Sequence, residues 1–536
     1  MRAITFLYGG ALAQEAFTAL NSGANAVMLA VEKASQFPGT EKIVFLGIEG
    51  KEYAGLIESE KFSIIRIPSW SKKSLLEQLS LNAREGNSAS AYDLCYFAWA
   101  DCPFLDPALA SALADRHLRY AAEYSYADGW PYGFAPELLA PGTAGLLHRI
   151  LGDDDGKVER DALFSILQKD INAFDIETEI SPVDLRFHRL TLAADSKRNL
   201  LLISRFMKAG LQCAADAADL IEKQPAILRT LPAFFNIQVS GGCPQTCSLC
   251  PWPQYGSRGN VPVTEAKSFM SRPHFETLLD NISGFSGGAV ISLSLWGELS
   301  LHPEKMELIK AVLSRPGLSL IIETSGIGWK TEELEAAAEA ALSAPVRENS
   351  LLGVPLSWVI SLDAHASARY REVRGPGFAE ATETAKKLLN LFPGNAYVQA
   401  VRIKDFEDDI EQFYHFWKEA AALAPPAKNT GSHVIIQKYD DFCGALPRLQ
   451  ASDLSPVKRS PCWHNMRDMV ILLDGSVPVC REDLAALNGN GACLGNAFTD
   501  TLAGIWERGE KLYLEQAGNK YSGICAVCDE FYTYNF

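Results

Sequence analysis

Short apolar runs alternate with amphipathic stretches along most of the chain. In the first third, apolar runs that predict strands lie at residues 4–8, 43–46, 62–67 and 92–98. Stretches with apolar positions three and four residues apart predict helices at residues 24–35, 73–81 and 107–120. Strands separated by single helices predict a mostly parallel α/β sheet.

The same alternation returns after residue 232 with a longer and more regular series. Six apolar runs predict strands at residues 234–239, 287–295, 318–322, 358–362, 397–403 and 434–437. Amphipathic stretches predict helices in the gaps, at residues 304–313, 332–342, 379–391 and 410–421. Six strands with intervening helices predict an open, partial (β/α)6 barrel, which places its site at the carboxyl ends of the strands.

The chain length and composition bound the class of protein. A chain of 536 residues exceeds one hydrophobic core, so roughly three domains are expected; we place them at 1–212, 232–450 and 455–536. The composition, 48% hydrophobic and 21% charged, is typical of globular proteins. A net charge of −16 argues against nucleic acid as a partner.

The sequence predicts a cytoplasmic protein without membrane contact. No run of about 18 apolar residues is present, and the first residues lack the apolar region of a signal peptide. Twelve cysteines in such a chain are typical of metal ligands and buried thiols rather than disulfides. Seven of them form two groups, and the scattered ones are Cys95, Cys102, Cys213, Cys443 and Cys493.

The first cysteine group follows the apolar run at 234–239. A serine and two glycines end the predicted strand, and Cys243, Cys247 and Cys250 follow in an irregular loop. Three thiolates cannot fill the four iron positions of a 4Fe–4S cluster, so one iron keeps an open site that can bind a substrate. The alternatives are a zinc site, which requires a fourth Cys or His nearby, or unrelated buried thiols.

With this C-x3-C-x2-C spacing directly after a strand, the chain resembles the radical S-adenosylmethionine (SAM) superfamily. In that family the cluster loop follows the first strand of a partial β/α barrel. The family usually has an aromatic residue before the third cysteine, lying against adenine. This chain has Leu249 there, so the contact would be aliphatic or Trp252 would supply the ring.

The resemblance also implies roles for residues at later strand ends. Gly297 and Glu298 match the family's Gly-Glu motif, whose backbone and carboxylate take the amino group of SAM. Ser325 lies in Thr-Ser-Gly, where the family often has Thr-Asn-Gly. For Glu298, the alternative is a carboxylate at a helix start.

Three further residues complete the implied SAM site. Ser361 and Asp363 lie where the family binds the ribose and the amino-acid end of SAM. Arg402, together with Gln399, is placed to reach the SAM carboxylate, with Arg402 forming a bidentate pair. The alternative is that these are ordinary polar residues at strand ends.

The second cysteine group contains Cys462, Cys480, Cys525 and Cys528. An Asp-Gly turn at 474–475 between two apolar runs predicts a hairpin that brings Cys462 and Cys480 together. The order Cys, Gly-x4-Cys, Leu-Gly-Asn resembles the SPASM-type extension of radical SAM enzymes, which carries auxiliary 4Fe–4S clusters. Four thiolates saturate one cluster, so one auxiliary cluster is predicted, with a four-thiolate zinc site as the alternative.

The first third resembles nucleotidyltransferases of the glycosyltransferase-A (GT-A) type, which activate sugars. Asp101 matches the position that holds a divalent metal in that family, and Asp195 follows a late motif of the same enzymes. Residues 9–25, where such enzymes hold phosphates, contain no Lys or Arg. We therefore expect a degenerate domain that binds a ligand, with Asp101 capping the next helix.

Together these features imply a radical SAM enzyme. The resemblance implies reductive cleavage of SAM to a 5′-deoxyadenosyl radical, which abstracts hydrogen from a peptide, protein or sugar-linked substrate. Flavodoxin or ferredoxin is the expected electron donor. The three-part order also resembles the spiro-SPASM proteins, for which the resemblance supplies no substrate. The alternatives are a nucleotidyltransferase of surface sugars with an appended redox domain, or a non-catalytic iron–sulfur electron carrier.

Overall fold

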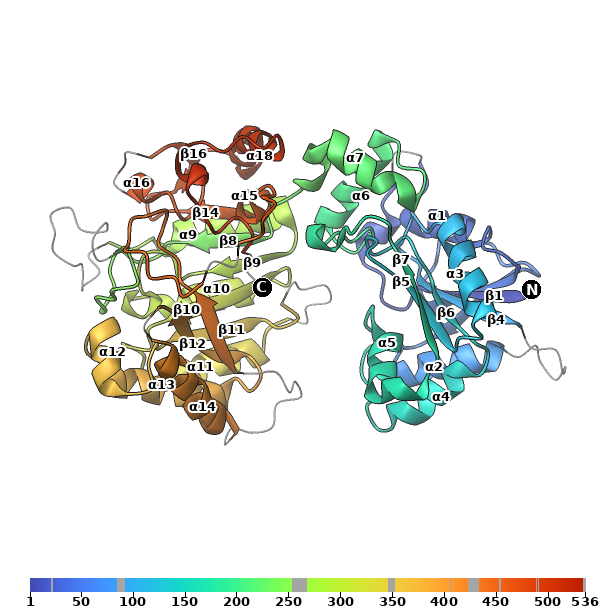
Figure 1. Cartoon of the computed structure of the whole chain (residues 1–536), viewed down its shortest axis with the longest axis horizontal. Helices are drawn as coiled ribbons and strands as arrows, with labels where there is room; N and C mark the ends of the chain where they lie inside the picture. Colours follow the sequence, from blue (N-terminus) through green and yellow to red (C-terminus); the bar gives the residue numbers. More distant parts are fainter. Residues whose placement is uncertain are drawn as a thin grey trace. The chain divides into compact units, whose positions relative to one another are not determined.

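The structure is a computed structural model of the chain (Figure 1). It describes residues 1–20, 23–83, 92–252, 268–345, 352–404, 406–422, 433–452, 455–487, 489 and 491–533. The chain divides into two compact units, Met1–Leu228 and Arg229–Phe536. Among the described helices, none is long and apolar enough to cross a membrane.

The N-terminal unit is built on a seven-stranded sheet in the order β3-β2-β1-β4-β6-β5-β7. Its strands are β1 (Ala3–Tyr8), β2 (Thr40–Ile48), β3 (Phe62–Ile67), β4 (Leu94–Trp99), β5 (Tyr124–Asp128), β6 (Glu137–Leu139) and β7 (Ile176–Ile180). β6 is antiparallel to β4 and β5, and the other pairs are parallel. The predicted mostly parallel α/β sheet is confirmed.

Four of the described α-helices of this unit begin at a side chain that caps the first turn. The α-helices are α1 (Ala26–Ala34), α2 (Lys72–Asn82), α3 (Pro107–Arg119), α4 (Thr143–Leu151), α5 (Ala162–Leu167), α6 (Lys197–Ala209) and α7 (Ala217–Lys223). Short 3-10 turns lie at Gln14–Phe17, Gln168–Ala173, Arg186–His188, Ala214–Asp216 and Pro225–Leu228. Asn25, Ser71, Asp106 and Ser196 each accept a hydrogen bond from an N–H of the following first turn.

The C-terminal unit contains a second seven-stranded sheet, in the order β13-β12-β11-β10-β9-β8-β14, and all its pairs are parallel. Its strands are β8 (Phe234–Ile237), β9 (Ala289–Ser292), β10 (Leu318–Thr324), β11 (Leu356–Ser361), β12 (Ala396–Arg402), β13 (Val434–Lys438) and β14 (Asp468–Ile471). The first six correspond to the six predicted barrel strands. The seventh, β14, comes from the region predicted as a separate domain.

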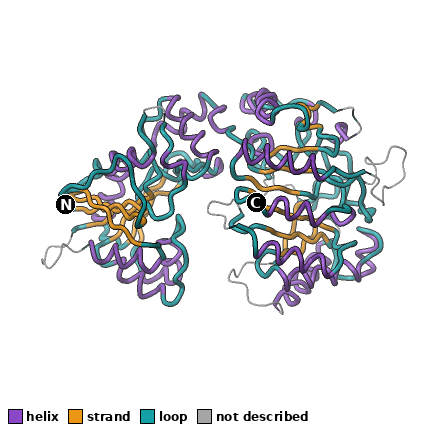
Figure 2. The backbone as a smooth tube through the Cα atoms, turned by 180° about the vertical axis from the view of Figure 1, so that it is seen from behind, coloured by secondary structure: helices purple, strands orange, loops and turns teal. Residues whose placement is uncertain are grey.

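Helices cover one face of this sheet (Figure 2). They are α9 (Arg272–Ser286), α10 (Lys305–Leu313), α11 (Thr331–Leu342), α12 (Ser367–Val373), α13 (Phe378–Leu391) and α14 (Glu407–Ala422), with a 3-10 turn at Leu299–Leu301. Because successive strand residues point to opposite faces, Leu320 and Ile322 join the core shared with the helices. Ile321 points the other way and packs with Val290 and Val359.

The C-terminal region folds onto the barrel sheet. Its remaining elements are α15 (Trp463–Arg467), β15 (Ser476–Pro478), α16 (Leu484–Leu487), β16 (Cys493–Asn496), α17 (Leu502–Arg508), α18 (Glu510–Ala517) and a 3-10 turn at Gly523–Ala526. Val477, Ile505 and Trp506 belong to the same core as the barrel helices. The Trp506 indole also donates to the carbonyl of Thr230 at 2.7 Å. These residues therefore lie in one compact unit with the barrel.

The predicted hairpin around residues 474–475 is wrong as a pair of strands. The turn forms, with the N–H of Leu472 donating to the carbonyl of Ser476 at 2.8 Å. The flanking strands pair elsewhere: β14 runs parallel to β8, and β15 runs antiparallel to β16. β14 is almost wholly buried, and the equally buried β8 offers it a full ladder, which a short hairpin partner does not.

Candidate functional site

The loop after β8, which carries the three predicted cluster ligands, is held by backbone hydrogen bonds. The N–H groups of Thr246 and Ser248 donate to the carbonyls of Arg374 and Val373, at 3.3 and 2.8 Å. The N–H of Gly241 donates to the carbonyl of Ser268 at 3.0 Å. The loop is therefore fixed at the end of α12 although it has no regular secondary structure of its own.

The three thiols of this loop are partly buried. Cys243 and Cys250 pack against an apolar cluster that includes Trp296. Burial raises the pKa of Cys243 and Cys247 and raises the pKa of Cys250 to about 12. The nearby Arg374 guanidinium acts in the opposite direction on the pKa of Cys247. Because iron binds thiolates, binding of a cluster here would release protons.

Gly297 lies where the loop after β9 touches the cysteine loop. A Cβ atom at this position would lie 2.0 Å from the carbonyl oxygen of Ser240 and 3.4 Å from that of Gly242. The next N–H, that of Glu298, donates to the carbonyl of Gly242 at 2.8 Å. Both contacts are with backbone atoms, so only glycine permits this close approach.

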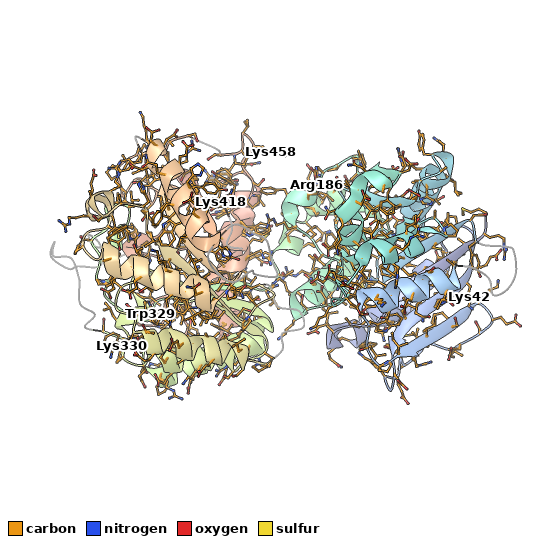
Figure 3. All side chains as sticks on the ribbon, turned by 90° about the horizontal axis from the view of Figure 1, so that it is seen from below. Lys42, Arg186, Trp329, Lys330, Lys418 and Lys458 are labelled. Carbon is orange, nitrogen blue, oxygen red and sulfur yellow. The ribbon has the colours of Figure 1, made fainter. Side chains whose placement is uncertain are left out.

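The carboxylate of Glu298 is buried beside this contact, with 4% of the residue exposed. Its Oε1 accepts from the Thr324 hydroxyl at 2.7 Å, and its Oε2 accepts from the N–H of Ser325 at 2.8 Å. The indole of Trp329 (labelled in Figure 3) donates to the Thr324 hydroxyl oxygen at 2.9 Å, which orients that hydroxyl toward Glu298.

Glu298 has no cationic side chain as a partner within the described part of the chain. Burial raises the pKa of Glu298, and the hydrogen bonds from Ser325 and Thr324 act against this rise. All the hydrogen bonds that Glu298 receives come from neutral donors, which are the side chain of Thr324, the backbone and side chain of Ser325, and the backbone of Ser300. Because a buried anion without a countercharge is costly, the site favours a ligand that brings a positive charge.

The remaining predicted SAM contacts separate into two groups. Asp363 pairs with Arg374 at 2.5 Å, and both lie close enough to Cys247 to influence its pKa. Arg402 instead pairs with Glu407 at 2.7 Å, and 46% of its side chain is exposed. The structure thus brings Asp363 to the cysteine loop and does not bring Arg402 there.

Ser361 belongs to a hydrogen-bonded group around Glu323 that sequence reasoning missed. The Ser361 hydroxyl and the Gln399 amide donate to Glu323 Oε1 at 2.8 and 2.9 Å. Glu323 is exposed and lies on β10, next to the strand of Ser361. Ser361 and Gln399 are polar donors at the ends of neighbouring strands, and such a pair indicates a shared acceptor nearby. This pattern in the sequence could have indicated Glu323.

Arg374 is a second residue that sequence reasoning missed. Burial lowers the pKa of its guanidinium, but Cys247 and Asp363 outweigh this effect and hold the pKa well above its ordinary value. Its Nε–H is buried and has no hydrogen-bond partner among the described residues. Asp363 also has a positive φ of 58° and accepts from the N–H of Val401 at 2.8 Å, so its carboxylate is held firmly toward Arg374.

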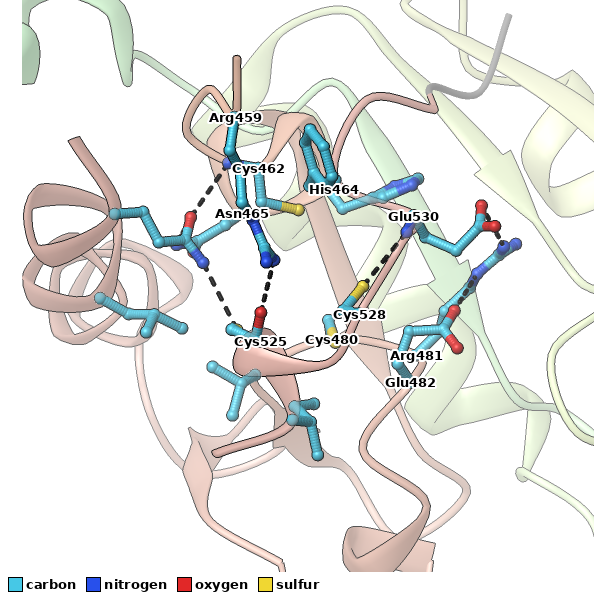
Figure 4. A pocket seen from close by; sticks show the side chains of 15 residues that line it. Arg459, Cys462, His464, Asn465, Cys480, Arg481, Glu482, Cys525, Cys528 and Glu530 are labelled. Carbon is cyan, nitrogen blue, oxygen red and sulfur yellow. Dashed lines mark hydrogen bonds and ion pairs between the residues drawn. The ribbon is translucent and has the colours of Figure 1, made fainter. Parts of the chain in front are cut away.

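The four cysteines of the second group line one pocket (Figure 4). The side chain of Gln516 accepts from the N–H of Cys462 at 3.0 Å and donates to the sulfur of Cys525 at 3.4 Å. The sulfur of Cys528 accepts from the N–H of Glu530 at 3.3 Å. Hydrogen bonds of this kind orient thiolate ligands and tune the reduction potential of a cluster.

Two cysteines that the sequence left unassigned have different surroundings. Cys443 lies beside Cys528. The pKa of Cys443 is raised, mainly by the hydrogen bond between the two thiols and to a smaller extent by burial. Cys493 is exposed on β16 and is not among the residues that line the pocket. Only proximity in three dimensions reveals Cys443, because it lies outside every recognisable spacing.

Comparison with known families assigns the C-terminal region. Residues 462–529 match the SPASM family, described as an iron-sulfur cluster-binding domain. This match begins at Cys462 and contains all four cysteines of the pocket. The parallel sheet, the three-cysteine loop after β8 and the region that matches SPASM thus lie in one compact unit of the chain.

The chain also has a relative that matches it along almost the whole length of that relative. An uncharacterized protein of Treponema pallidum (strain Nichols) is 36% identical over 382 residues, which cover 70% of this chain and 98% of the relative. The chain belongs to the family of this Treponema pallidum protein.

Two solved structures show more distant likenesses. Streptococcus suis SuiB bound to precursor peptide SuiA is 16% identical and has a TM-score of 0.41, covering 59% of this chain and 74% of SuiB. A cytidylyltransferase from Leptospira borgpetersenii is 14% identical and has a TM-score of 0.34, covering 42% of this chain and 95% of that enzyme. TM-scores of this size do not establish a shared fold.

Proposed function

We propose that this chain is an enzyme that reductively cleaves SAM at a 4Fe–4S cluster held by Cys243, Cys247 and Cys250. One observation carries the proposal: Glu298, a buried carboxylate without a cationic partner, lies beside a loop with three thiols. When bound, the cluster supplies one electron to the sulfonium of SAM, and the resulting 5′-deoxyadenosyl radical abstracts hydrogen from the substrate.

The residues around the loop suit the amino-acid end of SAM. Glu298 accepts the ammonium group, and the carbonyl groups that surround Gly297 supply further acceptors. The close backbone contact at Gly297 keeps these acceptors in a fixed position. Ser325 contributes through its N–H, which donates to one oxygen of Glu298 and helps to hold the carboxylate in position.

We assign the SAM carboxylate to Arg374 instead of Arg402. Arg374 is buried next to Cys247 and retains an Nε–H without a partner in the described structure. Asp363 fixes the guanidinium through one nitrogen, Tyr370 forms a second side-chain hydrogen bond with it, and the Nε–H is left to a ligand. Arg402 lies in an exposed pair with Glu407 and is not needed for this role.

We further propose one auxiliary 4Fe–4S cluster on the four SPASM cysteines, where it exchanges electrons with the substrate or holds it. Gln516, which is 1% exposed, would keep two of these ligands in place through its amide. The substrate is a peptide, protein or sugar-linked compound. Flavodoxin or ferredoxin would supply electrons in the cytoplasm, a location that twelve free cysteines support.

The test is anaerobic purification and reconstitution of the full chain, followed by assays for iron and for 5′-deoxyadenosine with SAM and dithionite. Replacing Cys243, Cys247 and Cys250 together with Ala should remove about four irons per chain and abolish cleavage while the SPASM cluster remains. Cys493→Ala, at an exposed position outside both sites, is the matched control and should retain all the iron.

Two outcomes would contradict the proposal. Unchanged iron content in the triple variant would show that these thiols are not cluster ligands. Full iron content with intact SAM under strong reductant would instead favour an electron carrier, because a carrier has no reason to form 5′-deoxyadenosine.

A further inference from the structure

A partly buried arginine lies between two aspartates in the N-terminal unit. Arg160 donates to both oxygens of Asp101, at 3.2 and 2.7 Å, and to Asp195 Oδ2 at 2.9 Å. Asp101 follows β4 and is fully buried, and Asp195 lies just before α6. The two carboxylates thus converge on one point, and the guanidinium occupies it.

Aromatic rings hold this guanidinium in place. Its central carbon lies 4.5 Å from the ring centre of Trp99 and 5.2 Å from that of Tyr132. Burial by itself lowers the pKa of Arg160, but Asp101 and its other partners outweigh this and raise the pKa well above its ordinary value. The guanidinium is therefore charged, stacked and ion-paired at the same time.

The expected cap role of Asp101 is wrong. α3 is capped by Asp106, whose side chain accepts from the N–H groups of Ala108 and Leu109. Asp101 uses both of its oxygens on Arg160, and its Oδ1 also accepts from the thiol of Cys102. The carboxylate of Asp101 therefore pairs with Arg160 and does not cap α3.

The residues at this point do not fit a divalent metal ion. Mg²⁺ requires oxygen ligands at about 2.0–2.1 Å in a near-octahedral arrangement, and it usually keeps several waters. Here the space between the two carboxylates contains guanidinium nitrogens, and Trp99 and Tyr132 flank them. A metal at this point would require Arg160 to leave both aspartates.

The two glycines of the loop after β1 lie against aromatic rings. A Cβ atom on Gly9 would lie 2.3 Å from the Phe45 ring, and one on Gly10 would lie 2.4 Å from the Trp70 ring. Trp70 is itself fixed by a hydrogen bond from its indole to the carbonyl of Gly47 at 2.8 Å. These glycines therefore make room for aromatic packing.

We infer that the guanidinium of Arg160 takes the place of a divalent cation between Asp101 and Asp195, so that the N-terminal unit works without metal. One guanidinium of the chain itself serves both carboxylates. Removing the arginine would leave the fully buried Asp101 without this guanidinium, and its oxygens, together with those of Asp195, are of the type that binds Mn²⁺ or Mg²⁺. This inference is independent of SAM cleavage.

The test titrates Mn²⁺ into the full, cluster-loaded chain, with free Mn²⁺ measured by its electron paramagnetic resonance signal. The wild type should show no Mn²⁺ site that depends on Asp101. Arg160→Ala should gain one site that binds at least tenfold more tightly than any in the wild type. The double variant Arg160→Ala/Asp101→Asn should lose that site, which separates it from other acidic groups.

A second measurement, the thermal midpoint of unfolding with and without Mn²⁺, distinguishes a missing Mn²⁺ site from a variant that fails to fold. Mn²⁺ should raise the thermal midpoint of Arg160→Ala and of Arg160→Gln, and should leave those of the wild type and Arg160→Lys unchanged. The inference is overturned if the wild type binds Mn²⁺ through Asp101. It is equally overturned if neither Arg160→Ala nor Arg160→Gln gains Mn²⁺ affinity or thermal stabilisation.

Discussion

Two buried carboxylates, Asp101 and Glu298, each follow a strand of a largely parallel sheet, and their surroundings differ in one respect. Asp101 is neutralised within the chain by Arg160. Glu298 receives hydrogen bonds from neutral donors and has no cationic partner among the described residues. Because burying an uncompensated charge is costly, the first site is complete in itself and the second favours a cationic ligand. The presence or absence of an internal countercharge thus distinguishes a closed site from an open one.

The glycines of the two units differ in the same way. Gly9 and Gly10 adjoin the rings of Phe45 and Trp70, which are side chains that fill the space above the loop. Gly297 adjoins the backbone of the cysteine loop, and the atoms nearest to a Cβ there would be backbone atoms of Ser240 and Gly242. In the N-terminal unit the glycines serve packing, whereas in the C-terminal unit one glycine lets two ligand-bearing loops touch.

The largest effect is expected from removing the internal cation. Arg160→Met should destabilise the N-terminal unit by about 3–5 kcal/mol, because it removes the guanidinium that pairs with the fully buried Asp101. Hydrogen–deuterium exchange of the amides of β1 and β4 would measure this loss locally. Arg186→Met is the control, since Arg186 is 61% exposed (Figure 3) and should change stability by no more than about 0.5 kcal/mol. A loss below about 1 kcal/mol for Arg160→Met would remove the contrast with Glu298.

The next effect concerns the backbone contact. Gly297→Ala should destabilise the C-terminal unit by about 1–3 kcal/mol, because the new Cβ would meet the Ser240 carbonyl at 2.0 Å. Gly284→Ala in α9 has nothing within 4 Å and should instead stabilise it by about 0.5–1 kcal/mol. Chemical denaturation of both variants makes the comparison. Equal and small effects would mean that the two loops do not touch as described.

Glu298→Gln tests whether the charge of the carboxylate without an internal countercharge contributes to SAM binding. Losing this charge should weaken SAM binding at least tenfold, or about 1.4 kcal/mol, and should leave iron content and stability nearly unchanged. Isothermal calorimetry under anaerobic conditions gives the affinity. Glu304→Gln, on an exposed side chain six residues further along, should bind SAM as the wild type does. Unaltered SAM affinity in Glu298→Gln would contradict the assigned role.

Glu137 is a third carboxyl group to compare with Asp101 and Glu298, and its substitution should have the smallest effect on stability. Its carboxyl group is hydrogen-bonded by the neutral hydroxyl of Tyr124, and burial raises its pKa from 4.5 to about 7. Between these values the native state binds a proton that the unfolded state does not, so this group loses its stabilising contribution as the pH rises from 4.5 toward 7. Glu137→Gln should remove that slope, which we expect to be roughly 1 kcal/mol because the side chain is partly exposed.

Denaturation at several pH values, with the exposed Glu159→Gln as control, would measure this slope. The control should keep the pH dependence of the wild type. A parallel pH dependence in Glu137→Gln and the wild type would show that Glu137 does not bind a proton in this pH range, which would contradict the prediction.

Local sequence patterns predicted the features that depend on neighbouring residues. Strand and helix alternation gave both sheets, and the cysteine spacings predicted two groups, one of which lines a single pocket. Contacts between distant residues were not predictable. Arg160 and Asp101 are 59 residues apart, and nothing in either segment indicates the other. The same holds for Cys443 beside Cys528, and for Arg374, whose proximity to the cysteine loop depends on how the end of α12 packs.

The pairing of β14 with β8 has a consequence for biosynthesis. Gln238, just after β8, accepts from the N–H of Leu473, which is translated 235 residues later. At ordinary elongation rates the ribosome needs on the order of ten seconds or more to supply that partner. Until then β8 has an open edge directly before the cysteine loop. We therefore expect the cysteine loop to reach its final position only after β14 has been translated and has paired with β8.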